Sequence, residues 1–156
     1  MKKSLTLVAL GALALTGCDF AGSTGAALVP AASIQVSGLP ATNGSSAWDS
    51  DGSSADVYVE IVNPSGRSVF RSAVQEDVAS DVLTFEIDEA VEIPFSSMAM
   101  HVRVFETDGD VILAQRMAKS ESFTLDQIAQ GDVQVSDASN GTQIRVVSSS
   151  QAQVVQ

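Results

Sequence analysis

The stretch DVYVEIV, residues 56–62, alternates apolar and polar side chains with the period of two that a β-strand produces. Its apolar face carries Val57, Val59 and Ile61, and its other face carries Tyr58 and Glu60. The next four residues, NPSG at 63–66, place proline second and glycine fourth, which favours a type I turn. The chain then returns as a second strand over residues 68–74. This stretch therefore predicts an antiparallel hairpin whose first strand is half buried.

The same alternation recurs along the chain at intervals of about ten residues. The further strands that it predicts span residues 33–37, 82–87, 97–106, 111–115, 132–135 and 144–147. Asp108-Gly109 and Asn140-Gly141 supply two of the turns between them. Seven or eight short strands indicate an all-β fold, an antiparallel β-sandwich over residues 33–147, in preference to a barrel or to βαβ units. Residues 148–156 form a polar tail.

One segment departs from the strand period. Thr124-Leu125-Asp126-Gln127 fits a capping box, in which the first and fourth residues satisfy each other's backbone amides, and Gly131 ends the segment. We therefore expect one short helix near residues 124–130. It is too short to change the fold class.

The charge balance limits the partners that this chain can take. Eight Lys and Arg against 19 Asp and Glu give a net charge of −11 and a pI near 4.2. Since a phosphate backbone selects for clustered Lys and Arg, no nucleic acid partner is expected. With 45% hydrophobic and 17% charged residues, the chain is too apolar to be disordered throughout. Its 156 residues suit one domain of ordinary size.

The first residues have the composition of a signal peptide. Lys2 and Lys3 are followed by an uncharged apolar run, residues 5–15, and then by Thr16-Gly17-Cys18. At about 1.5 Å per helical residue, that run covers about half of the hydrocarbon core of a bilayer, so it predicts no permanent transmembrane helix. Cys18 is the only cysteine of the sequence, which excludes an internal disulfide and a cysteine-based metal cluster.

Residues 15–18, Leu-Thr-Gly-Cys, resemble the lipobox of bacterial lipoproteins. The resemblance implies a signal peptide over residues 1–17, cleavage before Cys18, and attachment of acyl chains such as palmitate to Cys18. It also implies a protein lipid-anchored to a membrane of the cell envelope, outside the cytoplasm. Residues 20–32, FAGSTGAALVPAA, are small and uncharged and follow no strand or helix period, so we expect residues 18–32 to form a flexible lipidated tether. An ordinary secretory signal that contains a cysteine is the alternative. Asp19 leaves the membrane and leaflet open, because its meaning after the cysteine differs between bacterial phyla.

Two acidic loops of the sequence resemble those of C2 domains. Asp56-Val57-Tyr58-Val59 is similar to the family's Asp-Pro-Tyr-Val, with valine in place of proline. Residues 100–110, MHVRVFETDGD, are similar to the family's strand that ends in Val-x-Asp-x-Asp, with Glu106 and Asp108 at the two acidic positions. The resemblance covers roughly residues 33–147. It implies a C2-like β-sandwich with both loops at one end.

The C2 resemblance also implies a calcium site, because in that family these loops bind calcium that bridges to phospholipid. Ca²⁺ takes about six to eight oxygen ligands, which short carboxylates from two loops can supply. The candidate metal ligands are Asp49, Asp51, Asp56, Glu106, Asp108 and Asp110. The chain departs from the family pattern at Ser50, Glu106 and Ala114, where the family has aspartates. A solvated acidic loop end is therefore the alternative interpretation.

The sequence assembles no catalytic site, and we expect no enzyme. His101 is the only histidine, and it lies within a predicted strand without a serine or cysteine motif beside it. We expect a membrane-anchored envelope lipoprotein that acts as a binding or scaffolding module, with calcium as candidate cofactor. Its partner would be an unidentified envelope protein or lipid. A metal-independent structural accessory lipoprotein is the alternative, and a small hydrolase that uses His101 is a third hypothesis.

Overall fold

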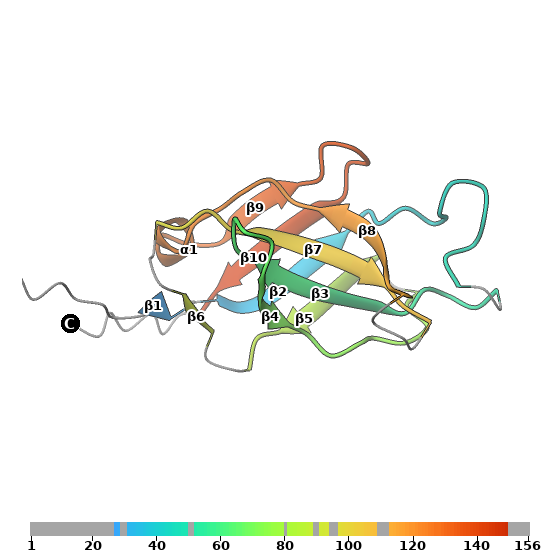
Figure 1. Ribbon diagram of the computed structural model, residues 1–156, viewed down its shortest axis with the longest axis horizontal. Helices are drawn as coiled ribbons and strands as arrows, with labels where there is room; N and C mark the ends of the chain where they lie inside the picture. The colour runs from blue at the N-terminus through green and yellow to red at the C-terminus, as the bar shows by residue number, and fades with distance from the viewer. Residues whose placement is uncertain are drawn as a thin grey trace, which may run out of the picture.

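The computed structural model describes most of the predicted domain. The described residues are 27–28, 31–49, 52–79, 81–88, 91–93, 97–108 and 113–149. In them, two four-stranded antiparallel sheets pack face to face, and one short helix lies at one end (Figure 1). The predicted all-β antiparallel sandwich is confirmed.

The two sheets have the strand orders β5-β2-β10-β9 and β4-β3-β7-β8. The first sheet consists of β5 (Val82–Glu86), β2 (Ala31–Ser37), β10 (Gln143–Ser148) and β9 (Val133–Ser136). The second sheet consists of β4 (Ser68–Arg71), β3 (Val57–Val62), β7 (His101–Glu106) and β8 (Gln115–Lys119). A separate short pair is formed by β1 (Ala27–Leu28) and β6 (Glu92–Ile93). The predicted hairpins β3–β4 and β9–β10 are both present.

The hydrophobic core lies between the sheets and takes side chains from nearly every strand. Ile34 on β2, Ile61 on β3, Phe85 on β5, Val104 on β7 and Ile144 on β10 are all at most 2% exposed. At about 25 cal/mol per Å² of apolar surface, burial of this kind is the main favourable term in folding. The apolar residues of the alternating sequence pattern therefore form the inward face of each sheet.

The helix α1 (Leu125–Ala129) confirms the predicted capping box. The backbone N–H of Gln127 donates to Thr124 Oγ1 at 3.3 Å, and the backbone N–H of Thr124 donates to Gln127 Oε1 at 2.8 Å. Leu125 and Ile128 are buried in the core. The helix thus closes part of one end of the sandwich.

The prediction that β3 is half buried is wrong, because all six of its residues are buried. On its outer face, Tyr58 is 2% exposed and Glu60 is 6% exposed. Tyr58 stacks on Phe105 of β7, with ring centroids 5.2 Å apart, and Arg71 of β4 binds Glu60 from the other side. Neighbouring side chains on the outer face therefore cover β3.

Two strand boundaries differ from the prediction where the strand period is lost. The pairing of β7 with β8 shifts between Val104 and Phe105, and both Met117 and Ala118 of β8 are buried. Of the strand predicted at residues 111–115, residues 111 and 112 lie outside the described residues, residues 113 and 114 are not in a strand, and β8 spans Gln115–Lys119. β7 begins at His101 and not at residue 97.

The N-terminal predictions fall largely outside the described residues. The signal peptide and Cys18 lie there, as does most of the polar tail. β1 and the first two residues of β2 fall within the range 18–32 that was expected to be a tether. Within the described part of the chain, no helix has the length and apolar character needed to cross a bilayer.

Candidate functional site

The two acidic loops meet at one end of the second sheet. Thr107 N donates to Asp56 O at 3.0 Å, which ties the end of β7 to the residue before β3. Asp56 Oδ1 in turn accepts from Asp77 N at 2.8 Å, and Asp49 Oδ2 accepts from Ser53 Oγ at 2.8 Å. We call the carboxylates of Asp49, Asp56, Glu106 and Asp108 the acidic end.

Glu106, the last residue of β7, is the most confined member of the acidic end. It is 1% exposed, and its Oε1 atom has no hydrogen-bond partner among the described residues. Burial contributes most to raising the pKa of the Glu106 carboxyl from 4.5 to about 7. The charges of Asp108, Asp49 and Asp56 and a hydrogen bond with Asp108 act in the same direction. At neutral pH the carboxyl therefore carries its proton about half of the time.

The acidic end brings together four of the six predicted metal ligands. Asp51 and Asp110 lie outside the described residues. Within the described ranges, no three acidic, histidine or cysteine side chains are arranged to hold a metal ion. Carboxylate oxygens are ligands that Ca²⁺ prefers, but the carboxylates of the described residues form no complete calcium site. Calcium binding stays a prediction.

His101 makes a backbone contact. Its Nδ1 atom lies 3.0 Å from Ser120 O, and because that carbonyl can only accept, Nδ1 carries the hydrogen. On β3 the residue opposite His101 is Val62. This contact holds the His101 ring against the backbone of Ser120.

The outer face of the second sheet carries a row of charged side chains that the sequence analysis missed. Arg71, Glu60, Arg103 and Lys119 are direct cross-strand partners on β4, β3, β7 and β8. Directly paired residues project from the same face of a sheet, so these side chains form one row. The adjacent row on this face consists of Tyr58, Phe105 and Arg116. We call Arg71, Arg103, Arg116 and Lys119 the basic face.

Glu60 neutralises one of these four cations. Arg71 Nε and Nη2 donate to Glu60 Oε1 at 2.8 and 2.6 Å, and the Arg71 guanidinium lies 5.3 Å from the centroid of the Tyr58 ring. Among the described residues, no carboxylate lies within 4.0 Å of the charged groups of Arg103, Arg116 and Lys119. Arg103 Nε is buried without a hydrogen-bond partner there. The basic face therefore keeps three cations without ion-pair partners in this part of the chain.

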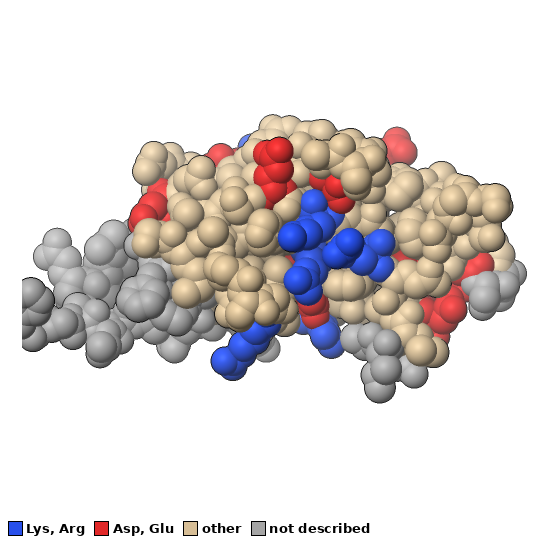
Figure 2. Space-filling view, turned by 45° about the horizontal axis from the view of Figure 1, so that its top comes forward, with Lys and Arg blue, Asp and Glu red and all other residues tan. Residues whose placement is uncertain are grey.

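The basic face concentrates charge that is scarce elsewhere. Lys2 and Lys3 precede Cys18, so six Lys and Arg follow it, and four of these six form the basic face. Figure 2 shows a group of Lys and Arg side chains at the middle of the visible face, with further ones at its lower edge. Within the two rows, Glu60 is the one carboxylate. A chain of net charge −11 thus carries a local positive surface.

Comparisons with known proteins give no family for this chain. No family profile matches it, and no curated protein sequence matches it. Ten solved chains resemble it in structure. One, described as "Structure of a C2 domain", has a TM-score of 0.47 and 13% identity, over 74% of this chain and 93% of that chain. Another, described as "CC2D1B coordinates ESRCT-III activity during the mitotic reformation of the nuclear envelope", has a TM-score of 0.42 and 9% identity, over 74% of this chain and 53% of that chain. These comparisons therefore assign no function to the chain.

We expect the stability of the fold to decrease as pH rises through the titration range of Glu106. Its pKa is about 7 in the folded chain against an ordinary 4.5, so between these values the folded state binds more protons than the unfolded state. The free energy of unfolding should fall by up to about 3 kcal/mol between pH 5 and pH 8. Glu106→Gln should remove most of this fall. Denaturant unfolding of both proteins at four pH values measures this fall. If the free energy of unfolding fell equally with pH in both proteins, the pH dependence would not come from Glu106.

Proposed function

We propose that this protein is a lipid-anchored lipoprotein of the bacterial cell envelope whose β-sandwich binds a phosphate-bearing ligand on the basic face. The observation that carries the proposal is the cross-strand row Arg71, Glu60, Arg103 and Lys119, with Arg116 beside it. Charged residues on a random surface of this chain would be mostly acidic, because Asp and Glu outnumber Lys and Arg by 19 to 8. A face with four cations and one carboxylate therefore differs from the mostly acidic surface that the composition predicts.

The arrangement of these cations suits an anion with several oxygens. The guanidinium group presents donors in a planar fork that matches phosphate or carboxylate, and it is weakly hydrated enough to bind at a surface. Arg103 lies between Glu60 and Lys119 in the row, and its Nε lacks a partner in the described residues. The stacked rings of Tyr58 and Phe105 form a rigid floor beside it. A phosphate group at this point would contact donors from β7 and β8.

The overall negative charge supports selectivity in this proposal. Salt screens charges beyond about 10 Å, so a small anion on the basic face experiences mainly the nearby cations. A large polyanion would also meet the acidic surroundings and be repelled. We therefore propose a small or singly exposed phosphate group of an envelope component as the ligand, and no nucleic acid.

Binding of inorganic tripolyphosphate tests the basic face. Arg103→Gln combined with Lys119→Gln should weaken binding by about tenfold or more, because each charge-assisted contact contributes about 1 kcal/mol or more. Arg67→Gln combined with Arg145→Gln is the matched control, since it removes two positive charges outside the two rows and should change affinity by less than about threefold. Titration calorimetry measures both. Equal losses in the two double variants would mean that only net charge matters.

The anchor part of the proposal rests on the match of residues 15–18 to a lipobox. Two or three acyl chains anchor firmly, because each buried methylene contributes about 0.8 kcal/mol. In a bacterial host, Cys18→Ser should shift the protein from the membrane fraction to the soluble fraction, or leave it unprocessed. Mass spectrometry of the unaltered protein should find acyl chains on an N-terminal Cys18. An unmodified Cys18 in the purified protein would reject the anchor while leaving the ligand site untested by that result.

Calcium responsiveness of the acidic end is a second candidate function. The observation in its favour is the buried Glu106 Oε1 atom, which lacks a hydrogen-bond partner among the described residues and faces the charges of Asp49, Asp56 and Asp108. If a cation binds, these four side chains would contribute oxygens, and the cation would offset their mutual repulsion. A metal-independent accessory role is the competing interpretation.

Thermal unfolding with calcium, and with magnesium at matched ionic strength, separates these interpretations. A cation that binds only the folded state at ten times its Kd should stabilise it by about 1.4 kcal/mol, a shift of several degrees. Asp56→Asn combined with Asp108→Asn should abolish the shift, whereas Asp126→Asn on α1 should preserve it. The absence of a calcium-selective shift in the unaltered chain would reject calcium responsiveness and favour the metal-independent role.

A further inference from the structure

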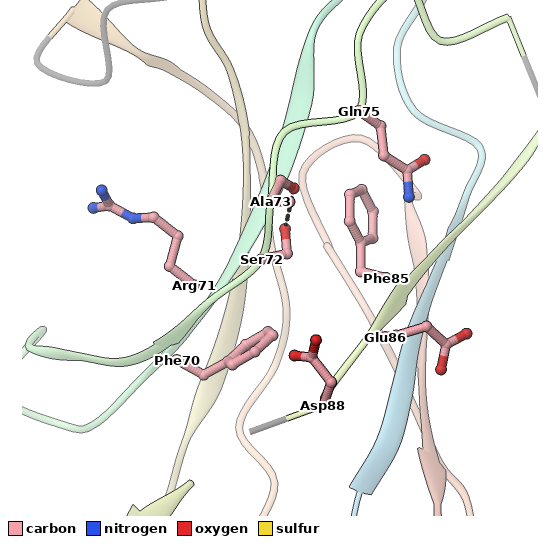
Figure 3. A pocket seen from close by; sticks show the side chains of 8 residues that line it. All are labelled: Phe70, Arg71, Ser72, Ala73, Gln75, Phe85, Glu86 and Asp88. Atoms are coloured by element: carbon pink, nitrogen blue, oxygen red, sulfur yellow. Dashed lines mark hydrogen bonds between the residues drawn. The ribbon is translucent and has the colours of Figure 1, made fainter. Parts of the chain in front are cut away.

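A cavity of about 370 Å³ opens on the side of the sandwich between two edge strands, β4 of one sheet and β5 of the other (Figure 3). Phe70 from β4 and Phe85 from β5 form its apolar walls, and they are 8% and 2% exposed. Apart from Arg71, no residue that lines it belongs to the basic face or to the acidic end. A volume at the lower limit of ligand pockets suits one inserted side chain.

One negative charge faces this cavity. Figure 3 shows the Asp88 carboxylate directed toward the space between the two phenyl rings, with the side chains of Arg71 and Glu86 pointing away. Arg71 is held on the outer face by its two hydrogen bonds to Glu60. Asp88 is exposed and forms no hydrogen bond or ion pair with another described residue. The described lining therefore offers a carboxylate and two aromatic rings without a neutralising cation.

This combination selects a basic side chain as occupant. A cation is attracted both by a carboxylate and by the electron-rich face of an aromatic ring. The aliphatic stem of Lys or Arg can pack on the phenyl rings while the charged end stays in polar surroundings. An anion would be repelled by Asp88, and an uncharged apolar group would desolvate that carboxylate without pairing it.

Among the described strands, β5 lies at the edge of its sheet, so some of its backbone groups face the side on which the cavity opens. Ile87 N donates to Ala32 O at 2.9 Å, and the register places Ile34 opposite Phe85. Hydrogen-bonded pairs alternate along an antiparallel ladder, so the amides and carbonyls of Thr84 and Glu86 point away from β2. Gln75 Nε2 already donates to Thr84 O at 2.7 Å, so the Thr84 amide and the backbone groups of Glu86 are the groups considered for an added segment.

Two exposed apolar side chains lie on the chain segments that carry the cavity's lining, although neither is part of that lining. Val82 begins β5 and is 52% exposed, and Val74, within the segment 72–75, is 40% exposed. Among the described residues, Leu113 is the one other large hydrophobic side chain that is exposed. An edge strand beside a cavity that holds both aromatic rings and a carboxylate is a feature of a surface that binds an extended peptide.

We propose that this cavity receives a lysine or arginine side chain from an extended segment of a partner protein that lies along the outward edge of β5 at Thr84 and Glu86. Asp88 pairs with the charged end, Phe70 and Phe85 contact the stem, and the Thr84 amide and the backbone groups of Glu86 bind the segment itself. The site goes beyond the proposed function, because it selects a cation, whereas the basic face selects an anion.

Two probe peptides test this proposal on the purified full-length chain in nonionic detergent micelles. Acetyl-Val-Lys-Val-amide and its norleucine analogue differ in the ammonium group alone. In ¹H–¹⁵N NMR titrations, the lysine peptide should shift the amides of residues 72–75 and 84–88 and bind about tenfold more tightly than the analogue. Asp88→Asn should abolish the preference, Asp88→Glu should retain it, and Asp126→Asn on α1 is the matched control.

Three results would overturn the proposal. The first is the absence of shifts at residues 72–75 and 84–88 at saturating lysine peptide. The second is equal affinity for the two peptides, which would mean that the cavity selects only apolar character. The third is a lysine preference that survives Asp88→Asn in a protein whose remaining spectrum is unchanged, which would place the cation elsewhere.

Discussion

The ion pair between Glu60 and Arg71 determines how charge is arranged over the whole second sheet. Glu60 is 6% exposed at the centre of β3, and a buried carboxylate without a partner costs several kcal/mol. Two hydrogen bonds from Arg71 satisfy it and hold the guanidinium over the Tyr58 ring. The same bonds keep the Arg71 charge out of the cavity between β4 and β5 (Figure 3). This one contact therefore adds a cation to the outer face. It also leaves Asp88, which lines the cavity beside β5, without an ion-pair partner among the described residues.

Most of the fold could be predicted because local signals agree with tertiary packing. The alternation in β2, β5, β9 and β10 matches the inward face of the sheet, and the capping box at Thr124 fixes α1 through contacts within four residues. The failures occur where packing overrides the local pattern. β3 is buried on both faces by side chains that come from β4 and β7. β8 loses its alternation at the register shift opposite Val104 and Phe105, so its position could not be inferred from period alone.

The candidate sites show the same limit. The acidic end could be anticipated because its members lie close together in two loops next to recognisable strand ends. The basic face could not, since Arg71, Arg103 and Lys119 become neighbours only through the register of three strand pairs. A shift of one residue in any of these pairs would turn side chains to the opposite face. The cavity at Phe70, Phe85 and Asp88 is harder still to predict from the sequence, because it depends on how two separate sheets are stacked.

The separation of charges within one small sandwich has a consequence for binding. The basic face lies on the outside of the second sheet and includes Arg103 of β7. Glu106, the last residue of the same strand, belongs to the acidic end. At physiological salt these regions act on ligands mainly within about 8 Å, so each can select its own partner despite the net charge of −11. The strands between them are packed in the core and rigid, so ligands on the two surfaces would be held at a fixed spacing. A module that bound both of the proposed ligands in this way would bring an anionic and a cationic partner together by geometry, without requiring a change of conformation.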